Sequence, residues 1–531
     1  MISEEAENEW VPGTVHLVDV DHTLNVEHNG NSDVVLIPQP TKNPNDPLRW
    51  SRPKKEFQYA ILWIWSFLTS VATNWVGPAW DYWVSEFNTS YTVLNNTSAV
   101  GWCFLGLGCV LLQPLALKFG RRVVYLFASL CQLFGNVVGG KASTVQFMYG
   151  SNILTCFAGA PCDSLVQIST TDVFFQHERA NRISSLTFAL YSGSFLGPIA
   201  AGYIIESQGW RWCFWYLVIF FGVIFAIQVF FMEDSIFVRH DLDKQEENVI
   251  QQILSKESKV EQNIKITEEP TLAIPMKRTY YQKLGIWERE YNDKRPLWVI
   301  FSRPLMAATF PAVTWGGFVY GVQVMWLSLI ATTQSEFFAA EPYNFGASAV
   351  GDTNFGSLIG CFLGTFWGGI LSDKFVAWMA RRRNGILEPE YRLWFLLLPA
   401  VINSAGLLMY GLGLNSGVHW ILPAGFGMGF IGFGIGSGGA LILTYALDCY
   451  PEMQSDALVW ILFIRNMIGM AFTFAIQPWL DACGVVTTTW LMFMLSVVFN
   501  FSCLIFIKWG KSFRRWTKNS YLRYSDPNAI F

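Results

Sequence analysis

The amino-acid sequence predicts an all-helical integral membrane protein with twelve transmembrane helices in two halves of six. Three observations carry this prediction. The 531 residues are 52% hydrophobic and only 14% charged, whereas soluble proteins carry about 25% charged residues. The apolar residues form runs close to the roughly 20 residues that a helix needs to cross a bilayer. One long hydrophilic segment, residues 233–304, separates six such runs from six others.

The runs of the first half lie near residues 58–80, 94–116, 122–140, 146–171, 184–205 and 212–232. Those of the second half lie near residues 305–332, 348–372, 394–413, 419–446, 457–479 and 486–508. The polar, proline-containing start of the chain predicts a mostly disordered N-terminal segment. The resulting division is an N-terminal segment (1–55), a first six-helix bundle (56–232), a central loop (233–304), a second six-helix bundle (305–508) and a C-terminal tail (509–531).

Basic residues of the short loops gather on one predicted side of the membrane. Arg121 and Arg122 follow the second run and three arginines, 381–383, follow the eighth, whereas the opposite side has Lys141 and Arg211. Because loops rich in Lys and Arg stay in the cytosol, this asymmetry predicts cytosolic termini and a cytosolic central loop. We expect a multi-pass protein of the plasma membrane.

Three N-x-[ST] sequons begin at Asn88, Asn95 and Asn96, in the first loop on the predicted outer side. Such sequons accept glycans on surface loops of proteins that pass through the secretory route. Their clustering agrees with the orientation that the basic residues predict. We therefore expect N-glycosylation at one or more of the three.

Small residues recur at four-residue spacing in several runs. Gly360 and Gly364 belong to such a row in the eighth run, and the fifth run places Gly197 and Gly202 around Pro198. Small residues at this spacing let two membrane helices approach closely. The pattern favours an interface that moves during function, although ordinary tight packing would give the same row.

Asp163 lies near the middle of the fourth run. Ionisable residues inside membrane spans are costly and therefore mark functional sites by default. At 100° per residue, Asn152 and Thr170 point in nearly the same direction as Asp163, which predicts a polar stripe facing the interior. Asp163 is therefore the main candidate for a cation or proton site.

Arg465 is the basic residue that the sequence places inside a span, in the eleventh run. Pairing with Asp448 or Glu452 is the favoured interpretation of this arginine. A substrate contact and a permanent neutralisation of Asp163 are the alternatives. Weaker candidates for lining a substrate cavity are Asn74 and Trp75 in the first run, Tyr191 in the fifth and Asn466 in the eleventh.

Several motifs together resemble those of a known family. The segments "KFGRR" after the second run, "LGPIAAG" in the fifth and "GGILSDKF" after the eighth are similar to signature motifs of the major facilitator superfamily. The segments "NPNDPLRWS", "GAPCDSLVQISTTDVFFQHERA" and "YALDCYPE" followed by "RNMIGMAF" resemble a fungal branch of drug:proton antiporter-type transporters, which includes polyamine and organic-cation carriers. The resemblance implies two rocking bundles around a midplane cleft, with gating roles for Arg121, Arg122 and Asp373.

The sequence departs from the family pattern at three positions. Leu117 stands where the first loop motif usually has an aspartate, and Asn152 stands where the drug antiporters carry an arginine associated with proton coupling. Asp163 replaces the family's glutamate and preserves an acid. The resemblance therefore leaves an acidic substrate or proton site and puts the usual arginine-dependent proton route in doubt.

The expected function is secondary active transport of small organic molecules by alternating access. Export of a drug-like or secondary metabolite is the first expectation, uptake of polyamines or other organic cations is the alternative, and a non-transporting nutrient sensor is an alternative of another class. The sequence has no HExxH and no GxSxG motif, which argues against an enzyme. We expect no metal, no cofactor and no nucleic-acid partner, but a monomer in the lipid bilayer that binds a small-molecule substrate. Coupling to protons is left open.

Overall fold

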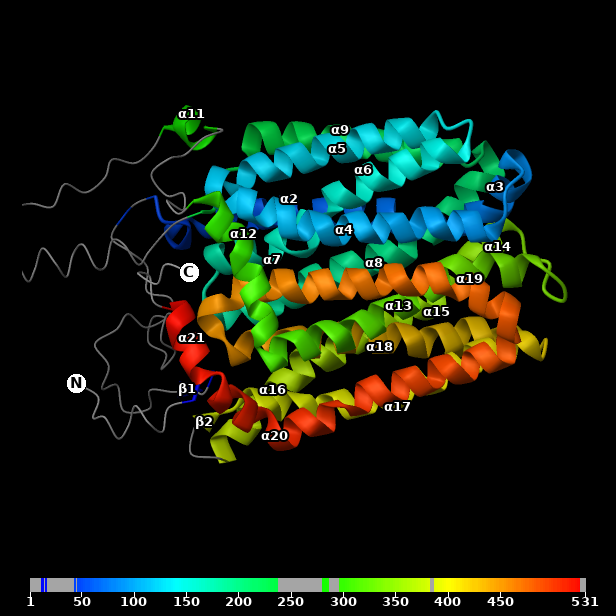
Figure 1. The fold of residues 1–531 in the computed structure, drawn as a ribbon. Coiled ribbons are helices and arrows are strands. Elements are labelled where there is room, and N and C mark those ends of the chain that lie inside the picture. The colour runs from blue at the N-terminus through cyan, green and yellow to red at the C-terminus, as the bar shows by residue number, and fades with distance from the viewer. Residues whose placement is uncertain are drawn as a thin grey trace, which may run out of the picture.

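The computed structural model of the protein describes residues 11–13, 15–16, 43, 45–236, 279–285, 296–382 and 386–525. Nearly all of the described elements are helices that run side by side along one direction (Figure 1). We name the two ends of this bundle after the short helices that lie there, α21 (Lys518–Ser525) and α3 (Trp80–Phe87). The strands in the described ranges are β1 (Val15–His16) and β2 (Ile386–Leu387), which pair antiparallel at the α21 end.

The first half consists of α2 (Arg52–Asn74), η2 (Gly77–Ala79), α3, α4 (Tyr91–Phe119), α5 (Arg121–Gly140), α6 (Val145–Asp163), α7 (Leu165–Val173), α8 (Gln176–Gln208) and α9 (Arg211–Phe231). The short η1 (Pro47–Arg49) precedes it, and α11 (Tyr280–Lys283), α12 (Leu297–Met306) and η3 (Ala307–Thr309) connect it to the second half.

The second half consists of α13 (Pro311–Ala339), α14 (Ala347–Asp352), α15 (Asn354–Phe366), η4 (Trp367–Leu371), α16 (Ser372–Arg382), η5 (Pro389–Leu396), α17 (Leu397–Asn415), η6 (Ile421–Gly427), α18 (Met428–Cys449), η7 (Pro451–Met453), α19 (Gln454–Phe501), α20 (Cys503–Trp516) and α21. The two halves form separate groups of helices in Figure 1, blue to green for the first and green to red for the second.

Ten helical stretches of the described chain are long and apolar enough to cross a membrane. One of them, Pro451–Trp516, makes two passes because Gly484 (φ 73°) interrupts α19 with a non-helical turn. The pair α6 and α7, which meet at Ser164, is not among the ten but forms one further crossing. The ten stretches, the second pass of Pro451–Trp516 and the pair α6 and α7 make twelve crossings, which confirms the predicted fold class.

Some boundaries differ from those predicted. Helix α2 begins at Arg52, inside the segment 1–55 that we expected to be mostly disordered, with Pro53 in its first turn, where proline is favoured. The predicted tail 509–531 is helical through α20 and α21 as far as Ser525. The last part of the predicted central loop forms most of α12. The rest of that loop, apart from 233–236 and 279–285, lies outside the described residues.

The glycine row of the eighth span packs the second half internally. A Cβ atom built on Gly360 would lie 3.0 Å from the backbone nitrogen of Phe433, and one on Gly364 would lie 3.0 Å from that of Ser437. Both neighbours belong to α18 of the same half. The close helix contact predicted for this row exists, but it does not lie at the interface between the halves.

The fifth span contains the glycine that does lie at that interface. A Cβ on Gly202 would lie 2.9 Å from Cα of Ser348 in α14, and one on Gly351 would lie 2.7 Å from the carbonyl oxygen of Pro198. Gly197 instead faces Val71 of α2, within the first half. Helices α8 and α14 therefore cross at backbone distance near the α3 end.

Candidate functional site

A break in the fourth span places Asp163 at the end of a helix. Pro161 lies in the last turn of α6, where it cannot donate the helical hydrogen bond. Asp163 ends α6, and Ser164 (φ −101°, ψ −57°) separates it from α7. Because of this break, the prediction that Thr170 continues the polar stripe of Asp163 is wrong. Thr170 lies in a different pocket of the first half and does not share a cavity with Asp163.

Asp163 forms an ion pair with Arg465 of α19, from Nη2 to Oδ2. The pair joins the first half to the second, and Arg465 is only 5% exposed. The favoured partners of this arginine, Asp448 and Glu452, were wrong, because Asp448 lies 3.9 Å from Arg392 instead. In the structure Arg465 pairs with Asp163, the acid named in one of the alternatives.

The remaining donors of Arg465 extend this ion pair into a polar network. Its Nε donates to Oδ1 of Asn466 over 3.0 Å, and its Nη1 donates to the hydroxyl of Tyr320 in α13 over 3.2 Å. The Tyr320 hydroxyl lies 3.0 Å from that of Tyr191 in α8. The network therefore crosses from one half to the other twice, once at Asp163 and once at Tyr191.

A central cavity of about 60 Å³ lies beside this network. That space is large enough for water, which needs a cavity of about 10–15 Å³, but it is too small for an organic solute. The cavity has a polar wall from α2 and α8 and an apolar part from α4 and α13. Its lining residues are Thr69, Ser70, Thr73, Asn74, Trp102, Leu105, Gly159, Cys162, Asp163, Leu190, Tyr191, Ser194, Tyr320, Val324, Leu327 and Arg465.

Two of the weaker sequence candidates, Asn74 and Tyr191, line the cavity with Asp163. The Asn74 amide donates to the Ser194 hydroxyl over 3.2 Å. Asn466 is fully buried and holds Arg465 without lining the cavity. Sequence reasoning missed Tyr320, because a tyrosine in an apolar run gives no signal of its own.

Trp75 does not line the cavity, contrary to the expectation. Its ring lies edge-on against Phe214 at 4.8 Å and Trp83 at 6.0 Å between ring centres, and it is 1% exposed. It follows Asn74 in sequence, so the two side chains leave α2 in different directions. Trp75 is part of the core of the first half.

The two halves also touch at both ends of the cavity. Near the α21 end, Nε2 of Gln113 donates to the carbonyl oxygen of Ser455 over 2.9 Å. Near the α3 end, the Tyr203 hydroxyl donates to Oδ2 of Asp352 over 2.9 Å. A second bond there runs from the backbone nitrogen of Ser348 to the Glu206 carboxylate, also over 2.9 Å. The network at Asp163 therefore lies between two further sets of contacts.

The gating residues expected from the family motifs lie at the α21 end. Arg121 forms an ion pair with Asp172 inside the first half. Arg122 donates to the carbonyl oxygen of Val229 over 2.6 Å. In the second half, Nη1 of Arg392 lies 2.7 Å from Oδ1 of Asp373. These contacts stay within one half or the other.

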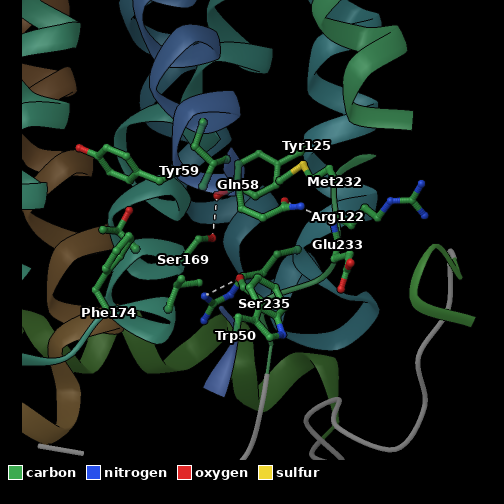
Figure 2. Close-up of a pocket in the computed structure, with 14 residues that line it drawn as sticks. Trp50, Gln58, Tyr59, Arg122, Tyr125, Ser169, Phe174, Met232, Glu233 and Ser235 are labelled. Atoms are coloured by element: carbon green, nitrogen blue, oxygen red, sulfur yellow. Dashed lines mark hydrogen bonds between the residues drawn. The ribbon is translucent and has the colours of Figure 1, made fainter. Parts of the chain in front are cut away.

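Arg121 and Arg122 line a small pocket of the first half, in which Figure 2 labels Arg122. Its free space is about 20 Å³, enough for water and too small for a transported solute. The Tyr125 hydroxyl lies 2.8 Å from that of Ser169 at its wall. Trp50, from the segment before α2, also lines it (Figure 2). We interpret this pocket as part of the packing of the first half.

The three sequons differ in their surroundings. Asn88 is exposed at the end of α3, with the left-handed backbone (φ 48°) that asparagine tolerates. Asn96 is half-buried within α4. Asn95 is 1% exposed, and its amide donates to Oε1 of Gln477 over 3.3 Å. The folded chain leaves no room for a glycan on Asn95, which makes Asn88 the site to test.

Comparisons with known proteins agree with the fold of two six-helix halves. Residues 62–474 match the profile of the Major Facilitator Superfamily. An uncharacterised MFS-type transporter of Schizosaccharomyces pombe, C1271.10c, is 33% identical, with 97% of this chain and 94% of the relative covered. The Saccharomyces cerevisiae protein HOL1 is 29% identical, with 97% of each chain covered.

Solved structures share the fold at low sequence identity. The xylose transporter XylE from E. coli, in a partially occluded inward-open conformation, has a TM-score of 0.59 at 12% identity. The alignment covers 86% of this chain and 98% of XylE. The human organic anion transporter MFSD10 has a TM-score of 0.54 at 12% identity, with 84% and 99% covered. The chain belongs to the major facilitator superfamily, whose members transport small molecules and are not enzymes.

Proposed function

We propose that this chain carries small organic cations by alternating access, and that Asp163 exchanges Arg465 for the cargo during the cycle. The observation that carries the proposal is the ion pair between the halves beside the central cavity. A buried charge that loses its partner costs about 3–5 kcal/mol. Separation of the halves around the cavity therefore requires a new partner for Asp163, and a cationic group or a proton can supply it.

The carboxylates near the α3 end support a cationic cargo. There Glu336 accepts a hydrogen bond from Nε2 of Gln477 over 3.2 Å, and Glu206 and Asp352 also bond to neutral groups. Glu86 at the α3 end pairs with Arg211, and at the α21 end carboxylates such as Asp373 pair with arginine as well. An excess of negative charge raises the local concentration of cations. The α3 end would therefore attract cationic cargo, which favours uptake from that side.

Export of a drug-like molecule, the first expectation from the sequence, is the second candidate. The apolar part of the cavity wall favours it, because Trp102, Leu105 and Leu327 offer the hydrophobic surface that drug-sized ligands bury. The direction of net transport follows the gradient that drives it. The two candidates therefore differ in the chemistry of the cargo and in the side from which it is loaded.

We place the protein in the plasma membrane as a monomer, with both termini in the cytosol and the α3 end outside. The basic loops and the exposed sequon at Asn88 support this orientation. Endoglycosidase treatment should increase the gel mobility of the wild type and leave that of Asn88→Gln unchanged. A protease site inserted beside Asn88 that is cut only from the cytosol would reverse the orientation.

Transport by the purified protein in liposomes tests the cargo. Labelled spermidine should accumulate saturably, and Asp163→Asn should raise its KM about tenfold or more, which corresponds to about 1.4 kcal/mol of lost binding. Glu56→Gln is the matched control, because it removes an exposed carboxylate that pairs with Arg182 and does not line the cavity. An unchanged KM for spermidine in Asp163→Asn would reject the role of this carboxylate in binding.

The same variant separates a cation site from a proton site. If Asp163 carries a coupling proton, Asp163→Asn should abolish accumulation driven by a pH gradient for every substrate while downhill exchange continues. If Asp163 binds the cargo, neutral substrates should still accumulate. Transport of neutral drug-like probes without any transport of spermidine would favour the export candidate.

A further inference from the structure

Residues 11–13 pack against the second half of the protein. Val11 is 4% exposed, and Pro12 and Gly13 are buried as well. Gly13 has a positive φ of 79°, and a Cβ atom there would lie 2.6 Å from the carbonyl oxygen of Asp448 and 2.8 Å from that of Cys449. Both the backbone conformation and the close approach require glycine at this position. The segment therefore rests directly on the last turn of α18.

A buried arginine holds the same segment. Arg514 of α20 is 0% exposed and forms a two-pronged bond with Glu390, with Nε to Oε1 at 2.9 Å and Nη2 to Oε2 at 2.6 Å. Its Nη1 donates to the carbonyl oxygen of Pro12. A guanidinium fixed by a bidentate carboxylate presents its remaining donors in a defined direction. The pair Glu390–Arg514 thus forms a built site for a peptide carbonyl.

Strand pairing adds a third contact. Val15 pairs with Leu387 and His16 with Ile386, so that β1 lies antiparallel to β2. Strand β2 leads within two residues to η5, which contains Glu390. Each of these three contacts joins residues 11–16 to the second half, at α18, at α20 and at β2.

We propose that residues 11–13 and 15–16 act as a peptide ligand of their own chain. By docking, they hold Arg392 between its two acidic partners. Arg392 lies in η5, two residues after Glu390, and reaches Asp373 at 2.7 Å and Asp448 at 3.9 Å. The docked segment holds η5 through Glu390 and Arg514 and rests on the backbone of Asp448. It therefore contacts both η5, which contains Arg392, and Asp448, which is one of the two acidic partners of Arg392.

The segment acts by local support within the second half. The contacts described for residues 11–13 and 15–16 reach α18, Arg514 and β2, all of which belong to that half.

Hydrogen–deuterium exchange on the purified full-length protein tests docking without any transport measurement. Gly13→Leu should speed amide exchange in residues 11–16 and 386–390 by about tenfold, because both lose their shared protection. Val11→Asp should do the same through a different contact. Gly222→Leu is the matched control, because a Cβ there meets only Leu133 at 3.8 Å within the first half, and it should leave exchange at 386–390 unchanged. Unchanged exchange in both test variants would reject docking.

Transport kinetics test the positioning role and separate it from cargo binding. Gly13→Leu and Val11→Asp should lower Vmax about threefold, the loss expected when one hydrogen bond that orients a group is weakened, and leave KM as in the wild type. A raised KM would mean that the segment acts on the cargo site. Faster exchange with an unchanged Vmax would overturn the supporting role. Faster exchange with a higher Vmax would also overturn it, and would show that the docked segment inhibits transport. These readouts hold for whichever cargo the protein carries.

Discussion

The interior of the second half and the interface between the halves are built from different contacts. Inside the second half, Gly360 and Gly364 bring the backbones of α15 and α18 together. Across the interface, side chains such as Gln113 and Tyr203 make single hydrogen bonds and Asp163 contributes one ion pair, in addition to the backbone crossing of α8 and α14 at Gly202. Water can replace a side-chain hydrogen bond when two surfaces part, whereas backbone contact at glycines leaves a void if it opens. The bundle is therefore suited to move as a body. The interface is suited to separate where side-chain bonds hold it, and the crossing at Gly202 is the part that resists opening.

The largest effect should come from filling the glycine row. Gly360→Leu and Gly364→Leu each force α15 away from α18. Because the added atoms meet backbone atoms and not flexible side chains, the cost should exceed the roughly 1–3 kcal/mol of ordinary overpacking and the roughly 3–5 kcal/mol of a broken buried ion pair. We expect a sharp loss of folded protein, measured as the monodisperse fraction and the melting temperature after purification. Ile359→Leu is the matched control, because Ile359 is 60% exposed on the same helix. A normal yield with full transport would show that the bundle interior tolerates separation.

The ion pair between the halves should rank second. Arg465→Gln leaves Asp163 buried without its cation, and breaking such a pair costs about 3–5 kcal/mol. We expect transport to fall at least 100-fold and thermal stability to fall as well. The double variant Asp163→Asn with Arg465→Gln should recover stability but not transport. If the double variant is less stable than either single one, the two residues do not act as a pair.

A larger side chain at the crossing of α8 and α14 should have an intermediate effect on the distance between the halves. Gly202→Leu should favour conformations in which the halves are apart at the α3 end, while each half stays folded. Spin labels at Ser85 and Ser416, exposed positions on opposite halves at that end, should report longer distances. Gly222→Leu is the control, because a Cβ there meets only Leu133 at 3.8 Å within the first half. An unaltered distance distribution would mean that this crossing does not resist opening.

The smallest effects should come from single hydrogen bonds across the interface, each worth about 0.5–1.5 kcal/mol. Tyr203→Phe removes the bond to Asp352 and should favour opening at the α3 end. Gln113→Leu removes the bond to Ser455 and should favour opening at the α21 end. The populations measured with spin labels should therefore shift in opposite directions. Shifts of the same sign would show that the two ends do not open alternately.

The sequence predicted the fold class well because bilayer-length apolar runs carry most of that information. It also singled out Asp163, because a carboxylate inside a span is costly wherever it lies. The partner of Asp163 could not be predicted, since Arg465 is 302 positions away in the sequence and residue patterns within one helix say nothing about distances between helices. The roles of Tyr320 and Trp75 were missed for the same reason.

Other errors of prediction could have been avoided, because the sequence contained a signal against them. Pro161 marks the break that removes Thr170 from the Asp163 face, so the assumption of one continuous helix failed there. The row at Gly360 correctly indicated close packing, but spacing alone does not say whether the neighbour belongs to the same half. The docked residues 11–13 lie in a polar, proline-containing stretch, and composition favoured disorder over the specific contacts of Gly13.

The pairing of Asp163 with Arg465 also constrains how this protein can evolve. A substitution at either position leaves an unbalanced charge in the membrane interior, so each single step passes through a poorly folded or inactive intermediate. Paired changes avoid that intermediate. Lineages that acquire a new cargo should therefore retain both residues or replace both together, and reconstructed ancestors should show the two positions changing on the same branch.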